Sequence, residues 1–125
     1  MNEKWHILYY VDQNGAKPVE GYIKKLSTSE RAKTLALIDH LGEKGPNLHR
    51  PYADLLEDGI HELRIKLTGT QVRILYFFCY QNIMVLTNVF DKHIDKVPKS
   101  EIKLAKKSRA DFLERYSEQD IRGLL

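Results

Sequence analysis

The sequence lacks several features that would define a class of protein at once. It contains one cysteine, Cys79, which excludes an intramolecular disulfide and a zinc site built from several thiolates. Its longest apolar run, residues 74–80, is far too short to span a bilayer, and residues 1–10 lack the pattern of a signal peptide. We therefore expect a reducing, cytoplasmic setting and no membrane partner.

Recognisable cofactor motifs are also missing. No glycine-rich phosphate loop precedes a helix, and no His-x-x-x-His pair or acidic cluster offers a metal cage. No Ser-His-Asp grouping is suggested, and Cys79 stands among aromatic residues, which favours a buried structural thiol over a nucleophile. We expect neither a cofactor nor a bound metal.

The 125 residues suit a single domain covering 1–125, and 42% hydrophobic with 30% charged residues is a globular composition. The charge is uneven. Residues 60–109 contain ten Lys or Arg and four Asp or Glu, a net charge of +6, whereas the rest of the chain carries −3. This asymmetry indicates a polyanionic partner, either nucleic acid or an acidic protein surface, with a merely solvated helix face as the alternative.

The periodicity predicts an α+β fold in the order β-α-α-β-β-β-α, with a helical hairpin and an antiparallel three-stranded meander. On the second helix we expect Ala32, Leu35, Ile38 and Leu41 to be buried, and on the last helix Leu104, Ala105 and Phe112. The expected strands are 5–11, 60–67, 72–80 and 83–90, and 47–58 is an irregular connection. The helices begin at Pro18, Ser27 and Pro98; Gly42 with Gly45-Pro46 ends the second, and the last runs to about Tyr116.

Three cations belong to the first two strands of the meander. Arg64 and Lys66 share a face because they are two residues apart. A two-residue loop at 69–70 pairs Lys66 with Arg73, one at 68–69 pairs Arg64 with Arg73, and both put all three cations on one face. A three-residue loop would turn Arg73 away.

Arg73 interrupts an otherwise apolar strand, which is costly unless the arginine has a partner or a function. Glu62 is one candidate partner, in a structural ion pair. The other explanation is that the cations cluster without matching acids and bind a phosphodiester. On the last helix, a lysine stripe is predicted to bind RNA phosphates, or alternatively to solvate the helix: Lys96, Lys99, Lys103, Lys106 and Lys107.

Four stretches carry a resemblance to a known family. They are 59–64 (Gly-Ile-His-Glu-Leu-Arg), 72–78 (Val-Arg-Ile-Leu-Tyr-Phe-Phe), 90–93 (Phe-Asp-Lys-His) and 97–102 (Val-Pro-Lys-Ser-Glu-Ile), followed by Ala105 and Asp111-Phe112. In this order, over about residues 5–116, the chain resembles the phage-derived Gp49-like, HigB-type branch of the RelE toxin superfamily. The resemblance implies a helical hairpin on a small twisted antiparallel sheet. It also implies the toxin of a toxin–antitoxin pair, with a helix-turn-helix, HigA-like antitoxin as its partner.

Many relatives cleave mRNA, often on the ribosome and without metal, so the resemblance implies a catalytic set and a mechanism. Attack of the 2′-hydroxyl on phosphorus would leave a cyclic phosphate and a 5′-hydroxyl. Lys66 is the candidate base, because the cations near it favour its neutral form. Arg73 and Arg64 would hold the phosphorane. Lys92 or His93 would assist the leaving group.

Two positions depart from the pattern of the family. Relatives usually have a second lysine where His93 stands, and this histidine either supplies a titratable donor or weakens the site. A tyrosine that some relatives use after the last strand has no counterpart, and Lys99 falls near its place. Two alternatives therefore stay open: a ParE-like inhibitor of DNA gyrase without enzymatic activity, and a non-catalytic RNA-binding module.

Overall fold

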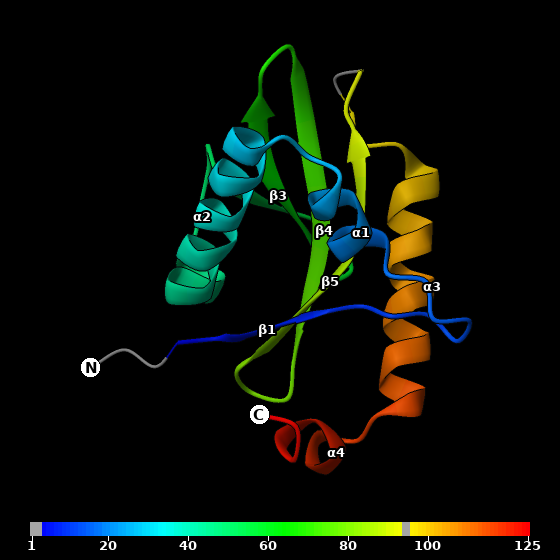
Figure 1. The fold of residues 1–125 in the computed structure, drawn as a ribbon. Coiled ribbons are helices and arrows are strands. Elements are labelled where there is room, and N and C mark those ends of the chain that lie inside the picture. The colour runs from blue at the N-terminus through cyan, green and yellow to red at the C-terminus, as the bar shows by residue number, and fades with distance from the viewer. Residues whose placement is uncertain (1–3, 94–95) are drawn as a thin grey trace.

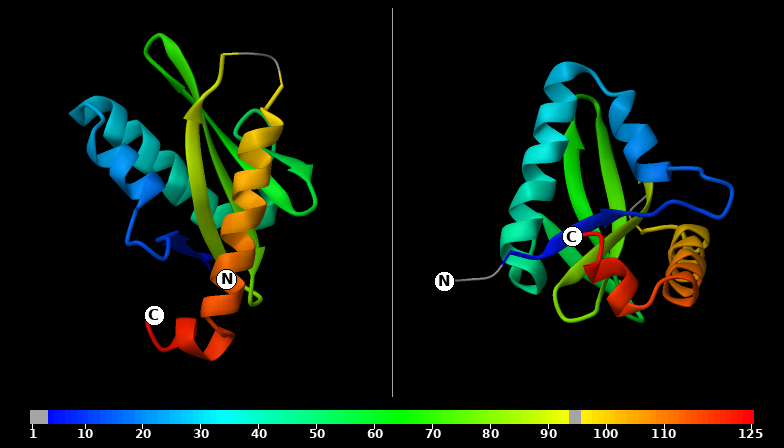
Figure 2. Two further views of the ribbon diagram at one scale, coloured as in Figure 1. Left: turned by 90° about the vertical axis from the view of Figure 1, so that its right-hand side faces the viewer. Right: turned by 60° about the horizontal axis from the view of Figure 1, so that its bottom comes forward.

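The computed structural model describes residues 4–93 and 96–125, which form a twisted mixed sheet with helices on both faces (Figure 1, Figure 2). The strand order is β1-β5-β4-β3-β2. The strands are β1 (His6–Tyr9), β2 (Ala53–Glu57), β3 (Ile60–Leu67), β4 (Thr70–Cys79) and β5 (Ile83–Asp91), and the helices are α1 (Pro18–Lys24), α2 (Thr28–Lys44), the 3-10 turn η1 (Gly45–Asn47), α3 (Lys99–Arg115) and α4 (Glu118–Arg122).

The sheet differs from the predicted one in two strands. β2 to β5 form an antiparallel meander of four strands rather than three, and β1 adds to β5 in the parallel direction. The prediction of an irregular connection at 47–58 is wrong for β2, a short edge strand whose register shifts between Leu55 and Glu57. Its sequence, Ala-Asp-Leu-Leu-Glu, lacks the apolar–polar alternation that marks a half-buried strand, and Leu55 is 57% exposed.

Local signals placed most helix ends correctly. The Ser27 side chain accepts a hydrogen bond from the Glu30 N–H at the start of α2, and Gly45 follows its end with a φ of 53°, where glycine is favoured. The short helix α4, which was not predicted, begins at a capping box between Ser117 and Asp120. The α+β class is confirmed, but the order of elements differs from the predicted one by the additional strand β2 and the additional helix α4.

Each face of the sheet has its own apolar core. The face covered by α1 and α2 buries Leu63, Ile65, Ile74 and Tyr76 of the central strands. The opposite face packs Ile60, Leu75, Phe77 and Val85 against Ala105 and Phe112 of α3. The two cores follow directly from strand alternation, since neighbouring residues of a strand point to opposite faces.

Two of the predicted helix faces are partly wrong. On α2, Ala32 and Leu35 are exposed, and Thr34 is buried with Ile38. The buried Thr34 hydroxyl is satisfied because it donates to the Glu30 carbonyl within the helix. On α3, Leu104 is 47% exposed. The buried side of α3 comprises Ile102, Ala105, Ser108 and Phe112.

Candidate functional site

The β3–β4 hairpin decides where the predicted cations lie. Leu67 pairs with Thr70 around a two-residue turn at Thr68 and Gly69, and Gly69 has a φ of 74°. This is one of the three loops that the sequence left open, and it sets Arg64 directly opposite Arg73. The side chains of Arg64 and Arg73 therefore share the face of the sheet on which α3 packs.

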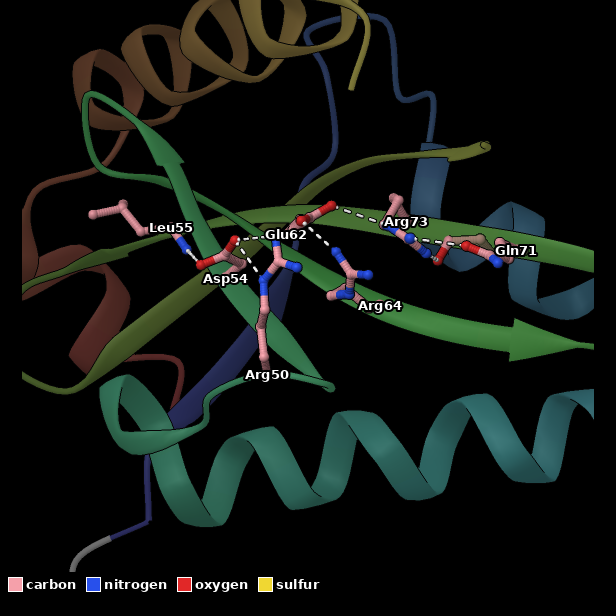
Figure 3. A network of polar contacts seen from close by, with 8 residues as sticks. Arg50, Asp54, Leu55, Glu62, Arg64, Gln71 and Arg73 are labelled. Atoms are coloured by element: carbon pink, nitrogen blue, oxygen red, sulfur yellow. Dashed lines mark hydrogen bonds and ion pairs between the residues drawn. The ribbon is translucent and has the colours of Figure 1, made fainter. Parts of the chain in front are cut away.

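Glu62 connects the two arginines (Figure 3). Its Oε1 lies 3.0 Å from the Arg73 Nε, although the Nε–H is not aimed at it, and its Oε2 accepts a hydrogen bond from the Arg64 Nη1 at 3.2 Å. The relative exposure of Glu62 is only 3% and that of Arg73 2%. The ion pair considered for Arg73 is thus confirmed, and the alternative of a cation cluster without a matching acid is wrong.

The two terminal nitrogens of the Arg73 guanidinium each donate one hydrogen bond. Its Nη1 donates to the Val72 carbonyl at 3.1 Å and its Nη2 to the Gln71 Oε1 at 3.0 Å. Burial lowers the pKa of the Arg73 guanidinium, and the charge of Arg64 lowers it further, while Glu62 acts in the opposite direction. The Arg73 side chain is thus buried on this face of the sheet, whereas the Arg64 side chain is partly open to solvent.

Beyond this pair, the end of the sheet opens into a hollow of about 510 Å³ beside the hairpin. Lys66, Gln71, Lys92 and His93 line it, and the Lys92 N–H donates to the Gln71 carbonyl at 2.7 Å. Lys66 and His93 are exposed and Lys92 is half-buried. Three of the five predicted catalytic residues meet here, and the two arginines belong to the neighbouring row of the same sheet face.

Gln71 is a site residue that sequence reasoning missed. It pairs with Lys66 across the hairpin, holds the Arg73 guanidinium and lines the hollow. The pairing follows from the loop at 68–69, so the register was the signal that could have identified it.

The predicted lysine stripe divides along α3. Lys106 lies 2.7 Å from a Glu57 carboxylate oxygen and 3.8 Å from Asp58, so the turn between β2 and β3 neutralises its charge. The other four lysines of the stripe, Lys96, Lys99, Lys103 and Lys107, are exposed. These four retain the charge needed to attract a polyanion.

Two further predictions concern metals and the thiol. Within residues 4–93 and 96–125, no group of three or more His, Cys, Asp or Glu side chains is arranged to hold a metal ion. Burial, and to a smaller extent the charge of Glu118, raises the pKa of Cys79 to about 11, which keeps it a thiol near neutral pH.

No helix in the described part of the chain is long and apolar enough to cross a membrane.

Comparison with known proteins gives one result. The family model described as phage derived protein Gp49-like (DUF891) matches residues 21–110. This range begins in α1 and ends in α3, so it includes the sheet face, the hollow and the lysines of α3. No curated protein matches the chain.

Proposed function

The chain belongs to the Gp49-like family of phage-derived proteins, a RelE/HigB-like toxin family, and from this premise we propose that it is an endoribonuclease toxin. The family is associated with the toxins of toxin–antitoxin pairs. The proposed substrate is mRNA, cleaved on the ribosome without a metal ion, and the outcome is inhibition of translation.

The observation that supports this proposal best is the gathering of Lys66, Lys92 and His93 around one hollow, with Arg64 in the adjacent row. Single-stranded RNA presents a phosphate at every nucleotide, and fixed cations favour its binding. An inhibitor that only docks on a protein would have no need for proton-transfer groups beside a phosphate-binding arginine. The cluster therefore favours cleavage over the gyrase alternative.

In the proposed mechanism, these side chains divide the work of transesterification. Lys66 accepts the proton of the 2′-hydroxyl, whose oxygen attacks the adjacent phosphorus. Arg64 stabilises the negative charge that develops on the phosphorane oxygens. Lys92 or His93 donates the proton to the departing 5′-oxygen, which leaves a 2′,3′-cyclic phosphate and a 5′-hydroxyl.

Arg73 has a different part in the proposal from the one expected of it. Its 2% exposure and its contacts with Glu62, Gln71 and Val72 leave no surface for a phosphate in this conformation. We assign it a positioning role: it holds Glu62, which in turn orients the Arg64 guanidinium.

The proposal is tested by adding the purified protein to a translating extract and mapping the 5′ ends of the mRNA. New ends that carry a 5′-hydroxyl, and that disappear in the Arg64→Ala variant, support it. Intact mRNA, together with inhibition of DNA gyrase by the protein in a supercoiling assay, would instead favour the ParE-like alternative. RNA that is bound and left intact would favour the non-catalytic module.

Metal independence needs a reaction without ribosomes, since ribosomes themselves require magnesium. Cleavage of free RNA should survive EDTA. A loss of cleavage in EDTA that magnesium restores would overturn this part of the proposal.

The proposed partner is a co-encoded antitoxin with a helix-turn-helix domain, as the toxin–antitoxin association of the family suggests. Its acidic or polar segment would cover the cationic end of the sheet. Co-expression should rescue growth and yield a stable complex. If the folded protein, expressed without an antitoxin, does not slow the growth of the host cells, the proposal that it is a toxin is contradicted.

A further inference from the structure

A second hollow, of about 500 Å³, lies between α2 and the free edge of β3. Its apolar lining includes Leu37 of α2, Ile65 of β3, and Pro51 with Tyr52 of the segment before β2. Tyr52 is 47% exposed, and its ring meets that of His40 edge-on with centroids 5.9 Å apart. We refer to this hollow as the Tyr52 groove.

The rim of the Tyr52 groove is cationic. Lys33, Arg64 and Lys66 line it, and no lining residue within the described chain is acidic. An apolar, aromatic interior with a positive rim complements a nucleotide, since a base can lie against apolar and aromatic surface while its phosphate meets the cations.

The Tyr52 groove is continuous with the proposed catalytic end of the sheet. Lys66 lines both hollows, and Arg64 belongs both to this groove and to the Glu62 network. The Lys33 ammonium donates a hydrogen bond to the Lys66 carbonyl, which fixes its charge at the junction. An RNA strand held by Arg64 and Lys66 would therefore have its neighbouring nucleotide at the mouth of the groove.

We propose that the Tyr52 groove is a base-binding subsite, in which Tyr52 stacks on an unpaired base next to the phosphate that Arg64 holds beside Lys66. The inference rests on the proposed ribonuclease function for its substrate class. It assigns Tyr52 to recognition of the base and Lys33, at the junction of the two hollows, to attraction of the RNA backbone. Neither residue takes part in proton transfer.

The test separates binding from cleavage. The probe is a short, fluorescein-labelled single-stranded RNA in which every 2′-hydroxyl is methylated, so that transesterification is blocked, together with an abasic version of the same chain. Binding is measured by anisotropy for the wild type, Tyr52→Ala, Tyr52→Phe and Lys33→Gln. Leu55→Ala serves as the matched control, because Leu55 is an exposed β2 side chain outside the groove. Melting curves confirm that each variant is folded.

We expect Tyr52→Ala to weaken binding of the methylated RNA by about 5- to 150-fold, the loss associated with one stacked base. Tyr52→Phe and Leu55→Ala should bind like the wild type, and the abasic chain should bind wild type and Tyr52→Ala equally. Lys33→Gln should reduce the slope of log affinity against log salt by about 0.7.

Equal binding of the methylated RNA by folded Tyr52→Ala and wild type would overturn the inference, even where the wild type cleaves unmethylated RNA. Loss of antitoxin binding in Tyr52→Ala with RNA binding intact would overturn it too, in favour of a protein-docking groove. Tyr52-dependent binding by a protein that cleaves no RNA would support the subsite and contradict the ribonuclease function.

Discussion

The two faces of the sheet differ in what fills them, although they are built from alternate residues of the same strands. The face against α1 and α2 is apolar along the length of β3, from Leu63 to Leu67. The face against α3 is apolar only at one end, around Ile60 and Phe77, and carries charges from Glu62 to the hairpin.

The charged part of the α3 face itself has two layers. Glu62 and Arg73 are buried and form an ion pair, whereas Arg64 is partly open and Lys66 is exposed. A buried carboxylate that holds one arginine inside the fold can orient a second at the surface. The buried pair therefore maintains the structure of the site, and the outer cations are available to contact a ligand.

The largest effect should follow from removing the buried carboxylate. Glu62→Ala leaves the Arg73 charge buried without its partner, and we expect it to lower the free energy of unfolding by about 3–5 kcal/mol in urea titrations. Glu57→Ala is the control, since the ion pair of Glu57 with Lys106 is at the surface and contributes less than about 1 kcal/mol. Equal stability of Glu62→Ala and Glu57→Ala would refute the division into two layers.

The two arginines should separate stability from cleavage. Arg64→Ala should reduce single-turnover cleavage by roughly 10²–10³, the loss for one transition-state donor, in a protein that remains folded. Arg73→Ala should instead lower the free energy of unfolding by about 1–3 kcal/mol and, per folded molecule, cleave faster than Arg64→Ala.

Arg73→Lys should recover little of the lost stability, because a point charge cannot reproduce the forked contacts to Glu62 and Gln71. Melting curves beside single-turnover assays provide both readouts. A fully stable Arg73→Ala that no longer cleaves would return Arg73 to direct contact with the phosphate.

The exposed lysines of α3 should contribute affinity and not chemistry. Reversing Lys103 and Lys107 to Glu should reduce the salt dependence of RNA binding, with a slope smaller by about 1.4, while cleavage at saturation stays near wild type. The control is Lys24→Glu with Lys25→Glu, which makes the same change of charge on exposed residues at the end of α1. If cleavage collapses with binding intact, the stripe belongs to the active site.

The smallest effect concerns the apolar face, where His61 stacks on Tyr76 with ring centroids 5.2 Å apart. Burial lowers the pKa of His61 from its ordinary 6.5, so the folded protein binds this proton less readily than the unfolded chain. The stability that neutral His61 provides is therefore complete above about pH 6.5 and is lost as the pH falls below it.

The melting temperature should accordingly decrease between about pH 7.5 and about pH 5.5, and decrease less in His61→Phe, which keeps an aromatic ring at this position without a titrating group. An equal decrease in both proteins would show that His61 does not account for the change.

Much of the candidate site could be predicted because strand alternation is a local property. Arg64 and Lys66 are two residues apart on β3, and this spacing alone places them on one face. For Arg73 the loop between the strands left three alternatives, two of which put it on the same face. The ends of α2 were predictable for the same reason, since Ser27 and Gly45 act within a turn of their own positions. Lys92 and His93 were expected from family resemblance alone.

Only the tertiary structure decided what depends on distant segments. The parallel pairing of β1 with β5, the edge strand β2 and the neutralisation of Lys106 by the β2–β3 turn all join parts of the chain far apart in sequence. The same holds for the burial of Arg73. By itself, the sequence determined which residues share a face; whether a charge there is buried or open depends on how the other elements cover it, because desolvation is set by the packed fold and not by neighbours in the chain.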